Sequence, residues 1–208
     1  MCLRRKRQST FLKLNWLDDL TAKLGVSDAA TPSLAGGDDF AFGGAQTGAT
    51  IVSDNPLIPT LDNQVQVFFK SQTPSPTDGA LYTLDIGGND IFNAVSGLKN
   101  GSITFDAMMT TFLNAAVMNT VTAISDLYAD GMRNLLYYEV PDLAVVPEFK
   151  ALGSEFATDA GTLAKDFTQA FSMTSKRSVC PGFAYSMFQS SVRWTRLSPT
   201  HQCSASRT

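Results

Sequence analysis

The sequence predicts a single α/β domain built on a parallel sheet. The chain has 208 residues, a typical length for one domain. Two short runs, residues 81–86 and 134–140, are apolar enough to be buried strands. Helical patterns over residues 61–70, 105–129 and 149–171 alternate with these runs, as is typical of parallel sheets. Because ligands of such sheets bind where the strands end, we expect a site at the ends of both runs.

The N-terminal part begins with a short amphipathic helix over residues 15–24. Gly25 follows it and is suited to end a helix. Residues 26–37 hold a proline and paired glycines and predict a loop, and an apolar stretch over residues 39–45 ends in a glycine turn. The apolar face of the helix consists of Trp16, Leu17, Leu20 and Leu24.

Glycine and proline punctuate the elements that follow. Residues 73–79 predict a loop, and the strand after them ends at Gly87-Gly88. Asn89 and Asp90 come next, and both are residue types that cap the start of a helix. The clearest helix spans residues 105–129, where the 3.6-residue period includes Met108, Met109, Phe112, Ala116, Val117, Val121, Ile124 and Tyr128.

Composition excludes several classes of protein. Hydrophobic residues make up 44% and charged residues 17%, which argues against a disordered chain and against a long charged coiled coil. Three cysteines without paired spacing exclude a disulfide scaffold and give no sign of a zinc site. His201 is the only histidine, so chemistry that needs two histidines is excluded. We therefore expect no metal.

Charge separates the two ends from the body. Residues 1–13 and residues 172–208 each hold five basic residues and no acidic one, whereas residues 14–171 hold all 19 acids and six bases. One interpretation is a pair of arms that bind nucleic acid or a membrane. We favour the other, solvated tails or sequence foreign to the body, because neither end interleaves its basic residues with aromatic ones. We thus expect no nucleic-acid partner.

No membrane or export segment is expected. The chain lacks an uninterrupted apolar run of about 18 residues, which predicts no transmembrane segment. The basic residues at the start are not followed by the apolar region of a signal peptide.

Two glycine turns carry the candidate chemistry. In Gly87-Gly88-Asn89-Asp90, the Asn89 amide is suited either to stabilise an oxyanion in acyl transfer or to cap the next helix. In Phe42-Gly43-Gly44-Ala45, backbone N–H groups are suited to the same oxyanion, or the segment is an ordinary turn. Phosphate-loop, dinucleotide and Gly-x-Ser-x-Gly patterns are absent.

Together these segments resemble the GDSL, or SGNH, esterase and lipase family, and the match is close to secreted bacterial members. The resemblance extends over about residues 14–171. Four segments carry it, in the order that the family has them: residues 15–20, the second block at residues 40–47, the third block Asp85-Ile86-Gly87-Gly88-Asn89-Asp90, and the strand and turn at residues 137–143.

The resemblance implies a three-layer flavodoxin-like fold and an oxyanion hole. Gly44 would donate its backbone N–H and Asn89 its side-chain amide, while Asp90 would brace the turn, with Gly43, Gly87 and Gly88 supporting it. Asp39 departs from the asparagine usual before the second block. The expected substrate is a small-molecule or lipid carboxylic ester, with no cofactor. Relatives are often secreted, and the sequence leaves the oligomeric state open.

The catalytic half of the family pattern is missing. Gly-Asp-Ser, which carries the nucleophile, does not occur, and neither does the Asp-x-x-His block: Ser198 stands three residues before His201. We therefore find no catalytic nucleophile or base and expect little or no ester turnover. The alternative is a non-catalytic remnant or ligand-binding module that keeps the cleft.

The losses coincide with the change in composition. We expect a basic non-family segment at residues 1–13, a partial hydrolase domain at residues 14–171, and a basic Ser- and Arg-rich tail at residues 172–208 that is disordered or out of frame. The first and last strands of the fold would be lost with these ends.

Overall fold

A computed structural model of the chain describes residues 16–48, 57–71, 79–178 and 184–188. The chain divides into two compact units, residues 1–41 and residues 42–208. Each unit is described by itself.

The first unit contains the predicted N-terminal helix. Helix α1 spans Trp16–Leu24, and Gly25 after it has a φ of +74°, as expected of the residue that ends a helix. The predicted loop contains two 3-10 turns, η1 (Ser27–Ala30) and η2 (Ser33–Ala35), and an isolated bridge joins Pro32 to Asp39.

The second unit contains a parallel sheet, which confirms the predicted α/β class. Strands β1 (Leu81–Asp85), β2 (Asn134–Tyr138) and β3 (Ala184–Phe188) lie in the order β1-β2-β3, and every pair is parallel. Leu81 pairs with Asn134, and Asn134 pairs with Ala184.

Strand β3 was not predicted from the sequence. It lies within residues 172–208, the segment expected to be a tail, at the point of the chain where the last strand was expected to be lost. In its run Ala-Tyr-Ser-Met-Phe, apolar and polar residues alternate too weakly to predict a strand. The segment is a strand because it pairs with β2.

The long central helix forms where it was predicted but contains a wider turn. Helix α4 (Phe105–Ala107) leads into a π-helical turn, η3 (Met108–Phe112), and then into α5 (Leu113–Ala129). Met108 and Phe112, the first and last residues of this turn, are both buried. Helices α2 (Leu61–Ser71) and α3 (Gly88–Asn100) precede it.

The helix predicted over residues 149–171 is two helices. Helix α6 spans Pro147–Leu152 and α7 spans Ser154–Ser178. Gly153 lies between them with a φ of +127°, a conformation that interrupts the helix. A short 3-10 turn, η4 (Leu143–Val145), connects β2 to α6 and begins with the Asp142 side chain accepting a hydrogen bond from the Ala144 N–H.

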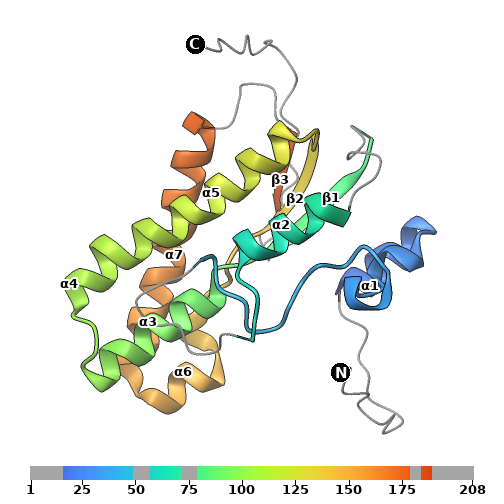
Figure 1. Ribbon diagram of the computed structural model, residues 1–208. Helices are drawn as coiled ribbons and strands as arrows, with labels where there is room; N and C mark the ends of the chain where they lie inside the picture. The colour runs from blue at the N-terminus through green and yellow to red at the C-terminus, as the bar shows by residue number, and fades with distance from the viewer. Residues whose placement is uncertain (1–15, 49–56, 72–78, 179–183, 189–208) are drawn as a thin grey trace, which may run out of the picture. The chain divides into compact units, whose positions relative to one another are not determined.

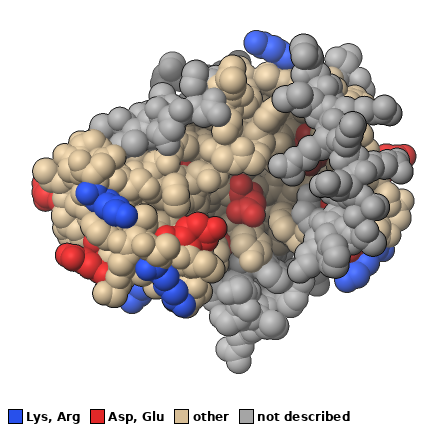
Figure 2. Space-filling model, turned by 90° about the horizontal axis from the view of Figure 1, so that it is seen from below, with Lys and Arg blue, Asp and Glu red and all other residues tan. Residues whose placement is uncertain are grey.

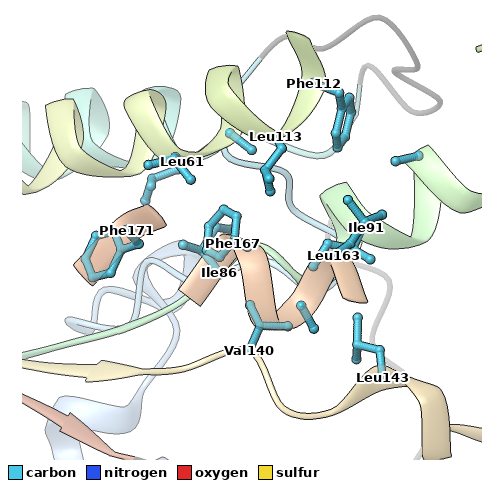
Figure 3. Close-up of a cluster of buried hydrophobic side chains, with 14 of the residues drawn as sticks. Leu61, Ile86, Ile91, Phe112, Leu113, Val140, Leu143, Leu163, Phe167 and Phe171 are labelled. Carbon is cyan, nitrogen blue, oxygen red and sulfur yellow. The ribbon is translucent and has the colours of Figure 1, made fainter. Parts of the chain in front are cut away.

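One apolar core joins the helices to the sheet. Helices α5 and α7 pack against each other, α2 packs on α5, and α3 packs on α7 (Figure 1). Figure 3 shows Phe167 of α7 beside Ile86 and Val140, which lie just after β1 and β2. The candidate site lies where β1 leads into α3.

One helix in the described part of the chain is long and apolar enough to cross a membrane. It is Phe105–Ala129, with a mean hydropathy of 1.3 over its best window, and half of that window is buried inside the protein. Core helices pass the same test, so this is weak evidence against the expectation of no transmembrane segment.

Candidate active site

The third block forms a sharp turn from β1 into α3. Gly87 has a φ of +106°, and a Cβ there would lie 2.9 Å from Phe167 Cζ and 3.1 Å from Val140 Cγ2. Only glycine fits both the backbone conformation and this space. Gly88, in contrast, faces open space. The turn therefore packs against the core on one side and leaves the start of α3 accessible on the other.

The second block forms a tight turn of four residues. The Ala45 N–H donates to the Phe42 carbonyl at 3.1 Å, and Gly44 has a φ of +87°. A positive φ at the third residue is the requirement of a type II turn. Gly43 and Gly44 are exposed, and among the described residues no acceptor takes the Gly44 N–H. This N–H is available to a ligand.

A buried hydrogen-bonded pair joins the second block to the third. The Thr47 N–H lies 3.1 Å from each carboxylate oxygen of Asp90, and the Thr47 hydroxyl donates to Asp90 Oδ1 at 2.7 Å. Both residues have no exposed surface. We call this pair the Asp90–Thr47 clamp. It holds together two segments that lie 43 positions apart in the sequence.

Asn89 adds a second link between the two blocks. Its side-chain Nδ2 donates to the Ala45 carbonyl at 2.9 Å, and Ala45 directly follows Gly44. An asparagine amide has two N–H groups, and the described residues provide one acceptor for them. Asn89 itself is exposed. The structure thus brings the Asn89 side chain to the turn that contains Gly44.

Burial shifts the titration of the clamp. The pKa of Asp90 is raised from 3.8 to about 6, because burial penalises the carboxylate more than the hydrogen bonds from Thr47 stabilise it. Asp90 is therefore ionised at pH 7 and above, the form that accepts all three hydrogen bonds from Thr47.

Sequence reasoning missed two residues of this arrangement. Thr47 is the last residue of the second block, but nothing in its local pattern indicates that it forms hydrogen bonds with Asp90. Asn119 of α5 donates to the Thr47 hydroxyl at 3.5 Å and lies so close to Gly48 that a Cβ there would overlap its amide. Asn119 carries no sequence signal at all.

Other predicted features belong to the first unit or lie outside the described residues. Asp39 belongs to the first unit, where its Oδ1 accepts the Ala41 N–H at 3.0 Å. Residues 1–13, Ser198 and His201 are not among the described residues. Within the described ranges, no group of three or more His, Cys, Asp or Glu residues is placed to hold a metal ion.

Acidic and basic side chains both lie on the face that carries α3 and α6. Figure 2 views the protein from the side on which α3 and α6 lie in Figure 1, and most of the described surface there is uncharged. The Lys and Arg side chains that are described on this face are scattered.

The fold and the two glycine turns define an α/β protein in which the turn after a parallel strand is hydrogen-bonded to a second glycine turn. A sequence model of the family described as GDSL-like Lipase/Acylhydrolase matches residues 7–207, and the chain belongs to this family. The match extends past both ends of the 14–171 range that the motifs indicated. No curated protein matches the chain.

Proposed function

We propose that the turns around Gly44 and Asn89 form the oxyanion-binding half of a carboxylic ester hydrolase site. One observation carries this proposal: the hydrogen bond from Asn89 to Ala45, held in place by the Asp90–Thr47 clamp, brings both candidate donors to one turn. The substrate would be a small-molecule or lipid ester.

The chemistry that such donors serve is acyl transfer through a tetrahedral intermediate. A serine oxygen attacks the ester carbonyl carbon as a base takes the serine proton, and the carbonyl electron pair moves to oxygen. The Gly44 N–H and the free Asn89 N–H would stabilise that oxygen. The intermediate then expels the alcohol, which takes a proton, and water releases the acyl group from the serine. Losing one such donor lowers kcat by about 10²–10³.

We propose that this chain by itself turns over esters slowly or not at all. The support is the absence of Gly-Asp-Ser and of Asp-x-x-His from its sequence. The same absence favours a second candidate, a ligand-binding module that keeps the donors without the chemistry. Both roles use the same turn, so they differ in turnover and not in where the ligand binds.

We also propose that the described strands belong to the flavodoxin-like SGNH fold, with no counterpart of its first strand among the described residues. The support is that β1, β2 and β3 are consecutive in the chain, adjacent and parallel, like the last three strands of the 2-1-3-4-5 order. Foreign sequence at one or both ends stays our hypothesis. Resequencing the gene with its flanks tests it: Gly-Asp-Ser upstream, or Asp-x-x-His in another reading frame, supports it, and their absence contradicts it.

Hydrolysis and binding assays with Asn89→Asp test the site. This variant keeps the side-chain shape but cannot donate from a carboxylate. Asn93→Asp, one turn further along α3, adds the same charge and is the matched control. We expect no hydrolysis of p-nitrophenyl butyrate above buffer in any form, and binding of butyrate that Asn89→Asp abolishes and Asn93→Asp preserves.

Two results would change the proposal. Hydrolysis well above buffer that is lost in Asn89→Asp would show an active enzyme and overturn the proposed inactivity. Equal butyrate binding by Asn89→Asp and the unchanged chain would remove Asn89 from the site.

A further inference from the structure

Helix α5 reaches the second block through one side chain. Asn119 is half-buried, its Nδ2 lies 3.5 Å from the Thr47 hydroxyl oxygen, and its amide covers Gly48. Neither residue of the Asp90–Thr47 clamp belongs to α5, because Thr47 lies in the second block and Asp90 in α3. The contact thus joins the clamp to a third segment of the chain.

The hydrogen bonds through Thr47 can run in only one direction. The Thr47 hydroxyl has a single hydrogen, which it donates to Asp90 Oδ1 at 2.7 Å. Nδ2 of an asparagine is a donor and never an acceptor, so the Thr47 oxygen accepts from Asn119. The chain of bonds therefore runs from Asn119 to Thr47 to Asp90 and ends on an acceptor, which the carboxylate form of Asp90 supplies.

We propose that Asn119 is a positioning residue for the candidate oxyanion site. By donating to Thr47, it keeps the Thr47 hydroxyl pointed at Asp90 and so holds the second block against α3. That the positioned groups form an oxyanion site rests on the proposed function. The Asp90–Thr47 clamp and the direction of its hydrogen bonds do not depend on that function. Asn119 acts on Gly44 and Asn89 only through Thr47.

We expect a change at Asn119 to alter the pKa of Asp90 measurably. The Asp85, Glu139 and Asp90 carboxylates all act on the buried Tyr137 hydroxyl and, after burial itself, raise its pKa. Helix α7, which packs on α3, places Phe167 beside Gly87. The hydrogen bonds from Thr47 are contacts that lower the pKa of Asp90. Weakening them should raise that pKa.

An NMR titration of the Asp90 carboxyl carbon in the full chain tests this proposal. Asn119→Ala should raise the Asp90 pKa by about one unit and speed hydrogen exchange at the Thr47 amide about tenfold. Asn119→Asp should raise the pKa further, because a carboxylate cannot donate to Thr47 and repels Asp90. Asn114→Ala, at an exposed position on the same helix, is the matched control and should leave both values unchanged.

The outcomes separate this proposal from the proposed function, because neither readout uses an ester. An unchanged Asp90 pKa in Asn119→Ala and Asn119→Asp would overturn the positioning role, whatever the ester experiments show. If Asn119→Ala does not fold, Asn119→Leu fills the same space without a donor and should give the same shift. A Leu variant that folds with an unshifted pKa would equally overturn it.

Discussion

Two fully buried polar side chains in different parts of this protein differ in whether their polar atoms have hydrogen-bond partners. At the junction of the second and third blocks, the Asp90 carboxylate accepts three hydrogen bonds from Thr47. In the core between β2 and α7, the Tyr137 hydroxyl has no hydrogen-bond partner among the described residues. The Tyr137 ring instead stacks on Phe171, with centroids 4.3 Å apart.

The difference separates two uses of a buried polar residue. Asp90 is valuable for its polar atoms, because they join segments that would otherwise be independent. Tyr137 is valuable for its ring, which fills the core and gains an aromatic contact, while its hydroxyl loses solvation without compensation. Removing the polar atoms should therefore harm the first region and not the second.

The largest effect should come from Asp90→Ala. This change leaves the Thr47 N–H and hydroxyl buried without their acceptor, and we expect the free energy of unfolding at pH 7 to fall by about 4 kcal/mol. Urea unfolding measures it, with the exposed Asp126→Ala as the control. A loss no greater than that of the control would show that the clamp does not stabilise the fold.

The pH dependence of stability should be the next largest effect. Because the folded pKa of Asp90 is about 6 against an ordinary 3.8, folding is favoured when Asp90 is protonated. This contribution is complete below pH 3.8 and lost as pH rises through 6. It amounts to about 3 kcal/mol. The difference in unfolding free energy between the unchanged chain and Asp90→Asn, measured from about pH 3.5 to 7.5, isolates it, and a flat difference would contradict the shift.

Two glycines that flank α3 sharpen the comparison between crowded and open positions. Gly87 and Gly101 both have positive φ, but a Cβ at Gly87 meets Phe167 and Val140, whereas one at Gly101 meets nothing within 4 Å. Gly87→Ala should therefore destabilise by about 2 kcal/mol more than Gly101→Ala. Thermal unfolding of both variants measures this difference, and equal losses would mean that the core yields freely at Gly87.

The smallest effect, with the opposite sign, should come from Tyr137→Phe. Removing a hydroxyl that lacks a partner should leave stability unchanged or raise it by about 1 kcal/mol. Phe171→Leu, which removes the stacking ring, should destabilise and is the control for the packing role. A clear loss in Tyr137→Phe would reveal a hydrogen bond to this hydroxyl and would end the contrast with Asp90.

Local sequence patterns predicted most elements of the fold but did not predict features that depend on pairing between distant parts of the chain. The spacing of apolar residues located α1, α2, β1, β2 and the long central helix, and the glycines located both turns. The break at Gly153 was missed because the helical period continues through it, from Leu152 to Phe156. Strand β3 was missed because its pairing with β2, more than its own pattern, defines it.

The same distinction holds for the candidate site. Gly44 and Asn89 stand out because glycine turns and an asparagine after a strand are local signals. Thr47 and Asn119 do not, because Thr47 lies 43 positions from Asp90 and Asn119 lies 72 positions from Thr47. One sequence alone does not indicate which threonine will form hydrogen bonds with a buried aspartate.

The half-buried apolar helix at Phe105–Ala129 has a consequence during synthesis. Its packing partner α7 ends at Ser178, 49 residues after Ala129. At about 5–20 residues per second, a ribosome needs roughly 2–10 s to make that interval. For those seconds the nascent chain presents an apolar segment long enough to resemble a membrane span. What binds this segment first in the cell therefore depends on how soon α7 is synthesised and packs against it.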